Sequence, residues 1–85
     1  MTKILIADPA REMRAALSAA LVPAGYDVIE ARDGEEALQW AATETPDVII
    51  MEALLPWVDG CEVLKRLRSN ATTQDIPVIF LARSP

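Results

Sequence analysis

Short runs of apolar residues alternate with segments of helical periodicity along the chain. The runs at residues 3–7 and 76–82 are almost continuously apolar, which is typical of parallel strands covered on both faces. The segment 47–52 also predicts a strand, and 26–31 predicts one that alternates more between apolar and polar residues. We therefore expect four strands, with the second nearer an edge of the sheet.

The first helix is predicted between residues 8 and 25. Asp8 and Pro9 should open it, because proline suits the first helical position, and Pro23 and Gly25 should end it. The positions expected to face inward are Met13, Ala16, Leu17, Ala20 and Leu21. The positions expected to face outward are Arg11, Glu12, Arg14 and Ser18.

Two further helices are predicted from their capping residues. Asp33 stands three residues before Glu36, and Asp59 three residues before Glu62, so each pair resembles a capping box. The resulting alternation of strands and helices predicts one α/β domain over residues 1–85. Its sheet should be open and parallel with helices on both faces.

Composition excludes several kinds of function. The 85 residues include 13 acids, 8 bases and no histidine, so histidine-containing triads and histidine-bound metals are excluded. The net charge of −5 argues against binding of nucleic acid by this domain. No apolar run approaches the roughly 18 residues of a membrane span, and the N-terminus does not resemble a signal peptide. We expect a cytoplasmic protein that is not an enzyme.

The lone cysteine adds little chemistry. With Cys61 alone the chain can form neither an internal disulfide nor a multi-cysteine zinc site. No histidine is present to activate its thiol. We predict a buried or half-buried structural thiol.

Two carboxylates stand at the carboxyl ends of predicted strands, where open α/β sheets carry their functional clefts. Asp8 follows the first strand and Glu52 ends the third, so they converge if these strands are neighbours. With a loop carbonyl, they could form a Mg²⁺ site. The alternative is that polar residues stand there because strand ends meet solvent. No glycine-rich phosphate loop is present.

Four segments together resemble the receiver domain of two-component response regulators. They are KILIAD at 3–8, ARDGEEAL at 31–38, PDVIIME followed by LLPWVDG within 46–60, and IPVIFLA at 76–82. The resemblance runs from residue 3 to residue 83. It implies a flavodoxin-like fold, in which the sheet has the second, first, third and fourth strands in that order. The family's fifth strand and last helices would lie beyond this chain. It also implies a function in accepting a phosphoryl group from a histidine kinase onto an aspartate with Mg²⁺.

The residues that carry this chemistry in the family are mostly changed here. The resemblance matches Asp8 to the first acid after strand one, but the second acid is replaced by Pro9. Glu52 stands at the phosphoacceptor position, and Ala82 lacks the hydroxyl of the switch position. Residual ligands for Mg²⁺ would be Asp8, Glu52 and the backbone carbonyl of Leu54, so Mg²⁺ binding should be weak.

These departures predict a pseudo-receiver that acts through a protein partner without phosphorylation. Because glutamate is one methylene longer than aspartate, its carboxylate is displaced from the in-line position, and displacements of about 1 Å are costly. The alternatives are an active phosphoacceptor that uses Mg²⁺ and a histidine kinase, or a fragment without activity of its own. Glu52 could also mimic the phosphorylated state. Otherwise it is a solvated acid, or one paired with Arg83.

Two apolar features suggest contacts with partners. Trp57 lies in the loop after the acceptor strand, where it could anchor a partner or fold over the pocket as a cover, and we favour the cover. The strand at 77–82 would form an exposed, uncharged edge once the family's last elements are absent. This edge could support a homodimer or segment exchange. The absence of the family's last elements has three possible explanations: the chain is a fragment of a longer protein, a natural short domain or an engineered truncation.

Overall fold

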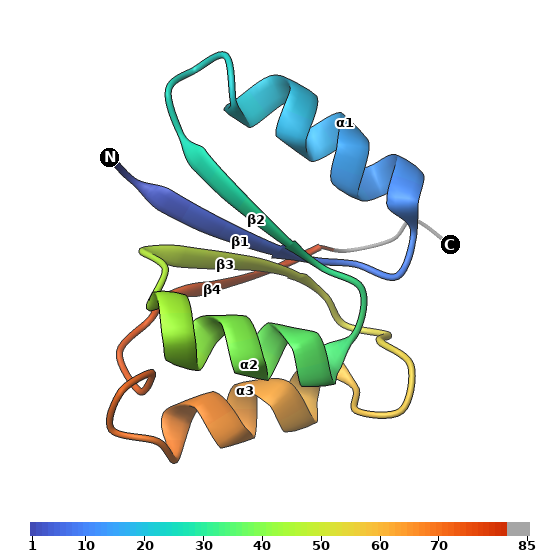
Figure 1. The fold of residues 1–85 in the computed structure, drawn as a ribbon. Helices are drawn as coiled ribbons and strands as arrows, with labels where there is room; N and C mark the ends of the chain where they lie inside the picture. The colour runs from blue at the N-terminus through green and yellow to red at the C-terminus, as the bar shows by residue number, and fades with distance from the viewer. Residues whose placement is uncertain (82–85) are drawn as a thin grey trace.

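The computed structural model describes residues 1–81 and contains four strands and three helices in that range (Figure 1). In chain order the elements are β1 (Lys3–Ala7), α1 (Arg11–Leu21), β2 (Asp27–Ala31), α2 (Gly34–Glu44), β3 (Val48–Glu52), α3 (Gly60–Arg68) and β4 (Val78–Leu81). The strands differ from the sequence prediction only at their ends. For example, the last begins at Val78, after Pro77, which cannot donate a ladder hydrogen bond.

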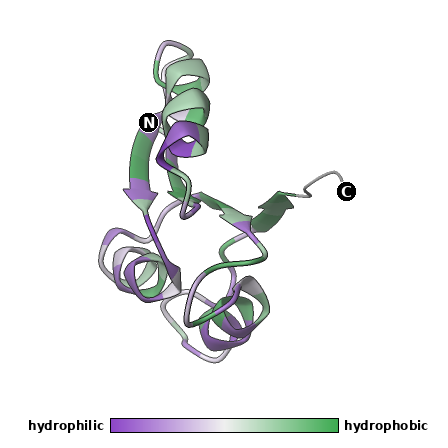
Figure 2. Ribbon diagram, turned by 90° about the vertical axis from the view of Figure 1, so that its right-hand side faces the viewer, coloured by the Kyte–Doolittle hydropathy of each residue, from purple (hydrophilic) through white to green (hydrophobic). Residues whose placement is uncertain are grey.

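The sheet is parallel, with the strand order β2-β1-β3-β4. This order confirms the predicted one. Helix α1 lies on one face, and α2 and α3 lie side by side on the other (Figures 1 and 2). The central strand β1 is buried along Ile4–Ala7, as its continuous apolar run predicts. The core lies mainly between the sheet and the α2–α3 layer and includes Leu5, Ile49, Met51, Val63 and Leu67.

Both predicted helix caps form. The carboxylate of Asp33 accepts a hydrogen bond from the N–H of Glu36 at 2.9 Å, and that of Asp59 accepts one from the N–H of Glu62 at 3.0 Å. Each bond satisfies an N–H that has no partner within the first turn. These caps fix where α2 and α3 begin, directly beside the carboxyl ends of the strands.

The start and orientation of α1 differ from the prediction. The helix begins at Arg11 rather than at Pro9, and the chain is extended at Ala10, which has φ −85° and ψ 114°. Arg14 is buried, while Met13 is exposed. Arg14 faces inward because its guanidinium donates hydrogen bonds to the Asp8 carbonyl and the Glu30 carboxylate, which lie beneath the helix.

The two small residues predicted to face inward from α1, Ala16 and Ala20, are also exposed. Leu17 and Leu21 are half-buried, so α1 covers the sheet with a narrower apolar stripe than its periodicity suggests. None of the helices within residues 1–81 is long and apolar enough to span a bilayer.

Cys61 is exposed, so the prediction of a buried or half-buried thiol was wrong. The inward positions of α3 are Gly60, Val63 and Leu67. Their spacing of three and four residues defines one helix face. Residue 61 is one step of about 100° away from Gly60 on the helix and points off that face.

Candidate functional site

Asp8 is fixed at the end of β1 by its own backbone and side chain. Its N–H donates to the carbonyl of Ala31 at 3.1 Å, which extends the pairing with β2 by one residue. Its Oδ1 accepts a hydrogen bond from the N–H of Ala10 at 2.8 Å, closing a turn around Pro9. The residue is 0% exposed. The turn therefore holds the Asp8 carboxyl group before α1 begins and accounts for the late start of that helix.

Glu52 ends β3 and is buried with 3% exposure. The register pairs Ala7 with Met51. Asp8 and Glu52 each follow directly after these paired residues, so they lie at the carboxyl ends of neighbouring strands. The Oε1 atom of Glu52 accepts a hydrogen bond from the N–H of Leu54 at 3.3 Å. The interpretation of Glu52 as a solvated acid was therefore wrong, because its longer side chain turns toward the loop that follows.

Two residues predicted to contribute to the site lie outside the described part of the chain. Ala82, at the predicted switch position, and Arg83, the predicted partner of Glu52, both belong to this group. Their predicted roles stay predictions.

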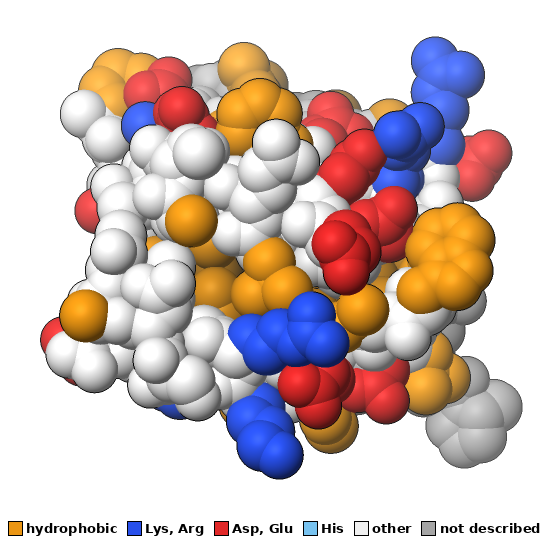
Figure 3. All heavy atoms as spheres, turned by 60° about the horizontal axis from the view of Figure 1, so that its bottom comes forward, with side chains coloured by type: hydrophobic (Ala, Val, Ile, Leu, Met, Phe, Trp, Pro, Cys, Tyr) orange, Lys and Arg blue, Asp and Glu red, His pale blue; other side chains and the backbone are white. Residues whose placement is uncertain are grey.

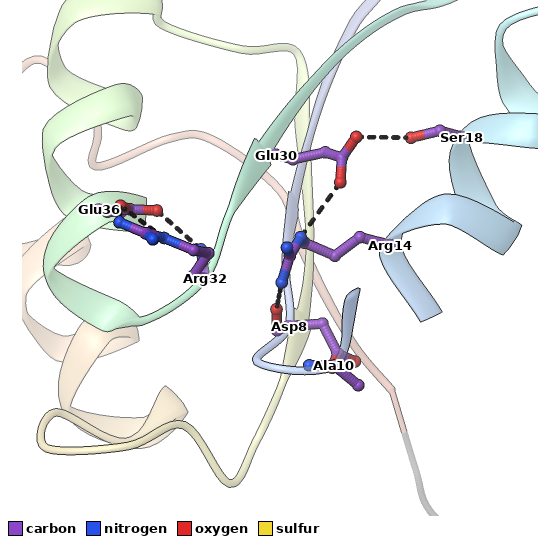
Figure 4. Close-up of polar contacts among 7 residues, drawn as sticks. All are labelled: Asp8, Ala10, Arg14, Ser18, Glu30, Arg32 and Glu36. Atoms are coloured by element: carbon purple, nitrogen blue, oxygen red, sulfur yellow. Dashed lines mark hydrogen bonds and ion pairs between the residues drawn. The ribbon is translucent and has the colours of Figure 1, made fainter. Parts of the chain in front are cut away.

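Arg14 joins three elements around Asp8 (Figure 4). Its Nη1 donates to the backbone carbonyl of Asp8 at 2.7 Å, and its Nε donates to Oε1 of Glu30 at 3.1 Å. Ser18, one turn further along α1, donates to the other oxygen of Glu30 at 3.4 Å. A charged donor on a buried carbonyl is among the stronger hydrogen bonds in proteins. Arg14 therefore holds the β1–α1 turn, a role that its outward position in the helical pattern did not indicate.

A second arginine–glutamate pair lies at the start of α2 (Figure 4). Glu36 accepts from the backbone N–H of Arg32 at 2.9 Å and from its Nη2 at 2.7 Å. The side-chain hydrogen bond from Arg32, followed by its backbone hydrogen bond, lowers the pKa of Glu36 below its ordinary value. The pair fixes Glu36 in its ionised form at the end of the sheet that carries Asp8 and Glu52.

The loop between β3 and α3 exposes two large apolar side chains. Trp57 is 88% exposed and Leu54 is 77% exposed. The indole therefore does not fold over the site, and the cover interpretation was wrong. Trp57 has a φ of 64°, a left-handed backbone conformation that is uncommon for a residue other than glycine.

The donor set around Asp8 and Glu52 fits a firmly held Mg²⁺ ion poorly. One oxygen of each carboxylate already accepts a backbone N–H, and Pro9 supplies no further carboxylate. Across residues 1–81, no cluster of three or more His, Cys, Asp or Glu side chains could hold a metal. Mg²⁺ prefers octahedral oxygen coordination and sheds its water reluctantly. Weak binding through Asp8, Glu52 and the Leu54 carbonyl stays a prediction.

Sequence comparison identifies one family along nearly the whole chain. The family model described as the response regulator receiver domain matches residues 4–84. The alkaline phosphatase synthesis transcriptional regulatory protein PhoP of Bacillus subtilis is 50% identical over 79 residues, which cover 93% of this chain and 32% of that protein. The response regulator MprA of Mycolicibacterium vanbaalenii is 39% identical, with 93% and 33% covered. The chain thus spans about a third of the length of these relatives.

Solved structures show the same fold. The N-terminal domain of a response regulator receiver protein from Methanoculleus marisnigri superposes with a TM-score of 0.95 at 30% identity, covering all of this chain and 69% of that one. The chemotaxis protein CheY4 of Vibrio cholerae gives 0.90 at 36% identity, with 100% and 72% covered. Solved structures therefore contain counterparts of the strand order, of the helix layers and of the carboxyl end of the sheet, where Asp8 and Glu52 lie.

Proposed function

The chain belongs to the response regulator receiver domain family, and we propose that it acts through protein contacts without being phosphorylated. In this function the domain is a cytoplasmic signalling module and not an enzyme. Its partner is a protein, either a histidine kinase or a downstream component. The formal charge of −5 makes nucleic acid an unsuitable ligand for this domain.

Support for this function comes chiefly from the position and contacts of Glu52. The residue stands where the family resemblance expects the acceptor aspartate, and it is buried with one oxygen on the Leu54 N–H. A phosphoryl acceptor must be in line with the donor and beside a charge-neutralising cation. A carboxylate with one oxygen held by its own loop is poorly placed for in-line attack, and Pro9 supplies no second acid to bind the cation.

The rival function is phosphotransfer onto Glu52 with Mg²⁺, and amide NMR distinguishes the two. Addition of acetyl phosphate to the domain already in Mg²⁺ is expected to leave the amide signals of Asp8, Ala10 and Leu54 unchanged. Weak ion binding at the carboxylate is already present in the Mg²⁺ reference spectrum, and Glu52→Gln, titrated in parallel, removes the acceptor carboxylate. Large shifts of these signals in the wild-type domain that are absent in Glu52→Gln would favour the phosphoacceptor function.

Self-association through the strand at 77–82 is a second candidate, favoured by the exposure of β4. Within residues 1–81, β4 pairs only with β3, so one side of its backbone has no strand partner. Ile79 is 55% exposed, and Figure 2 shows β4 as a hydrophobic strand at the margin of the sheet. Residues 78–81 carry no charge that would repel a second copy. Two identical edges can pair across a twofold axis.

The dimer is expected to weaken when a charge is placed on this edge. Ile79→Lys should shift the mass measured by size-exclusion chromatography with light scattering toward that of one chain, because the ammonium group cannot be buried unpaired. Val22→Lys is a matched control, since Val22 is also 55% exposed but lies at the end of α1. A wild-type mass of one chain at all concentrations excludes the dimer.

A further inference from the structure

The β3–α3 loop, residues 53–59, presents Leu54 and Trp57 to solvent while its other apolar residues are anchored. Leu55 is buried in the core, and half-buried Val58 packs against it. The loop therefore alternates between side chains that hold it and side chains that it displays. Two large exposed apolar groups so close in sequence are unlike the isolated apolar residues that are common on protein surfaces.

The backbone holds Trp57 in a costly conformation. The N–H of Val58 donates to the carbonyl of Pro56 at 2.7 Å, which closes a three-residue turn around Trp57. The φ of Trp57 is 64°, and turns of this hand are rare and strained. Glycine adopts such a φ without penalty, whereas a bulky side chain does not. Strain of this kind is characteristic of positions kept for binding rather than for stability.

Contacts on both sides hold the loop in its conformation. The N–H of Gly60 donates to the carbonyl of Ala53 at 2.8 Å and closes the base of the loop. Gly34, the first residue of α2, lies so close that a Cβ atom there would collide with the carbonyl oxygen of Val58. Because the loop is already ordered, a partner that binds it loses little conformational entropy.

Exposed acidic residues stand in the β3–α3 loop and at the start of α2, which lies against this loop. Asp59 follows Trp57 in the loop and is exposed, and Glu35 is exposed in the first turn of α2 beside Gly34. The guanidinium of Arg32 at this end is already paired with Glu36. Figure 3 shows acidic side chains, with some Lys and Arg side chains among them, next to exposed hydrophobic ones on the side where α2 and α3 begin. Complementary charge on a partner would steer it to this surface.

We propose that Leu54 and Trp57 dock into an apolar pocket of a protein partner whose rim carries lysine or arginine. This inference rests on the proposed function, which requires a protein partner, and it names the chemistry of that partner. Tryptophan is among the residues that contribute most to protein interfaces when its ring fills a desolvated pocket. The flanking acids would pair with the basic rim and select against acidic surfaces.

Selection from a phage-displayed library of random peptides tests this chemistry. Peptides enriched on the immobilised chain are expected to combine apolar residues with lysine or arginine. They should bind Trp57→Gly at least about tenfold more weakly than wild type, as expected for a tryptophan at the centre of an interface. In a Trp40→Phe background, the emission of Trp57 should shift to the blue on binding. Failure to enrich binders, enrichment of acidic peptides, or equal affinity for both proteins would overturn the docking surface.

Trp57→Gly also separates binding from folding. Because glycine tolerates the positive φ, this variant is expected to unfold at a higher urea concentration than wild type. Its affinity for the selected peptides should nevertheless fall. A lower unfolding midpoint would mean that the indole stabilises the loop, and it would overturn the proposal. Leu54→Ala provides a second variant without a backbone effect and should weaken the same peptides.

Repeating the binding with Mg²⁺ and acetyl phosphate distinguishes this inference from the proposed function. Equal peptide affinity with and without Mg²⁺ and acetyl phosphate supports both the docking surface and phosphorylation independence. Peptides that bind through Trp57 only after phosphorylation would support the docking surface and overturn phosphorylation independence. Equal peptide affinity of wild type and Trp57→Gly in both conditions would overturn the docking surface and leave phosphorylation independence standing.

Discussion

Replacement of Gly34 by alanine is expected to lower the free energy of unfolding by about 2 kcal/mol, the range found for overpacked sites. The added Cβ would collide with the carbonyl oxygen of Val58 and would lie 2.8 Å from Cγ2 of Val63. The first obstacle is backbone and the second is a buried β-branched side chain, so neither moves easily. Helix propensity alone predicts the opposite sign, because alanine favours a helix by about 1 kcal/mol over glycine.

Urea unfolding followed by circular dichroism measures this difference. Glu35→Ala is the matched control, because it places alanine at the next position of the same turn, where the side chain is exposed. That control should change stability by less than about 0.5 kcal/mol. A Gly34→Ala variant as stable as wild type would mean that the β3–α3 loop does not pack against α2 as described.

Truncation of Leu5 to alanine is expected to cost about 3 kcal/mol, within the range measured for buried leucines. Leu5 is 0% exposed in the central strand and belongs to the main core cluster. Strands on both sides of β1 limit how far the structure can collapse into the cavity. Natural domains have only about 0.05–0.15 kcal/mol of stability per residue. This one substitution therefore removes a large share of the total.

Leu54→Ala removes the same atoms from a side chain that is 77% exposed. Thermal and urea unfolding of the two variants should differ strongly, with Leu54→Ala close to wild type. Equal destabilisation by both variants would contradict the assignment of β1 to the core and of Leu54 to the surface.

Much of the fold could be predicted from local patterns. The continuous apolar run at 3–7 predicted β1 with the bounds it has, and Asp33 and Asp59 correctly marked the starts of two helices. These signals are local, because burial on both faces and N–H capping each leave a mark within a few residues. The strand order came from the family resemblance.

The orientation of α1 could not be predicted in the same way. Arg14 is buried because the Asp8 carbonyl and the Glu30 carboxylate lie beneath it, and these partners come from two other elements. The proline signal at Pro9 also misled, because the Asp8 side chain accepts the Ala10 N–H and uses those residues for a turn. Periodicity contains no information about such long-range partners.

The candidate site was predicted in position but not in geometry. Sequence placed Asp8 and Glu52 at neighbouring strand ends, where the structure has them. It did not indicate that Glu52 contacts the Leu54 N–H or that Trp57 is almost fully exposed. Both depend on the path of the β3–α3 loop, which is set by its contacts with Gly34 and Gly60.

The central claim is that Glu52 does not accept a phosphoryl group, and intact-mass spectrometry after incubation with Mg²⁺ and acetyl phosphate tests it most directly. With Glu52 turned toward Leu54 and no second acid at Pro9, the mass of the wild-type chain is expected to stay unchanged, as is that of Glu52→Gln. A stoichiometric gain of one phosphoryl group by the wild type, absent in Glu52→Gln, would contradict the account and identify Glu52 as a working acceptor.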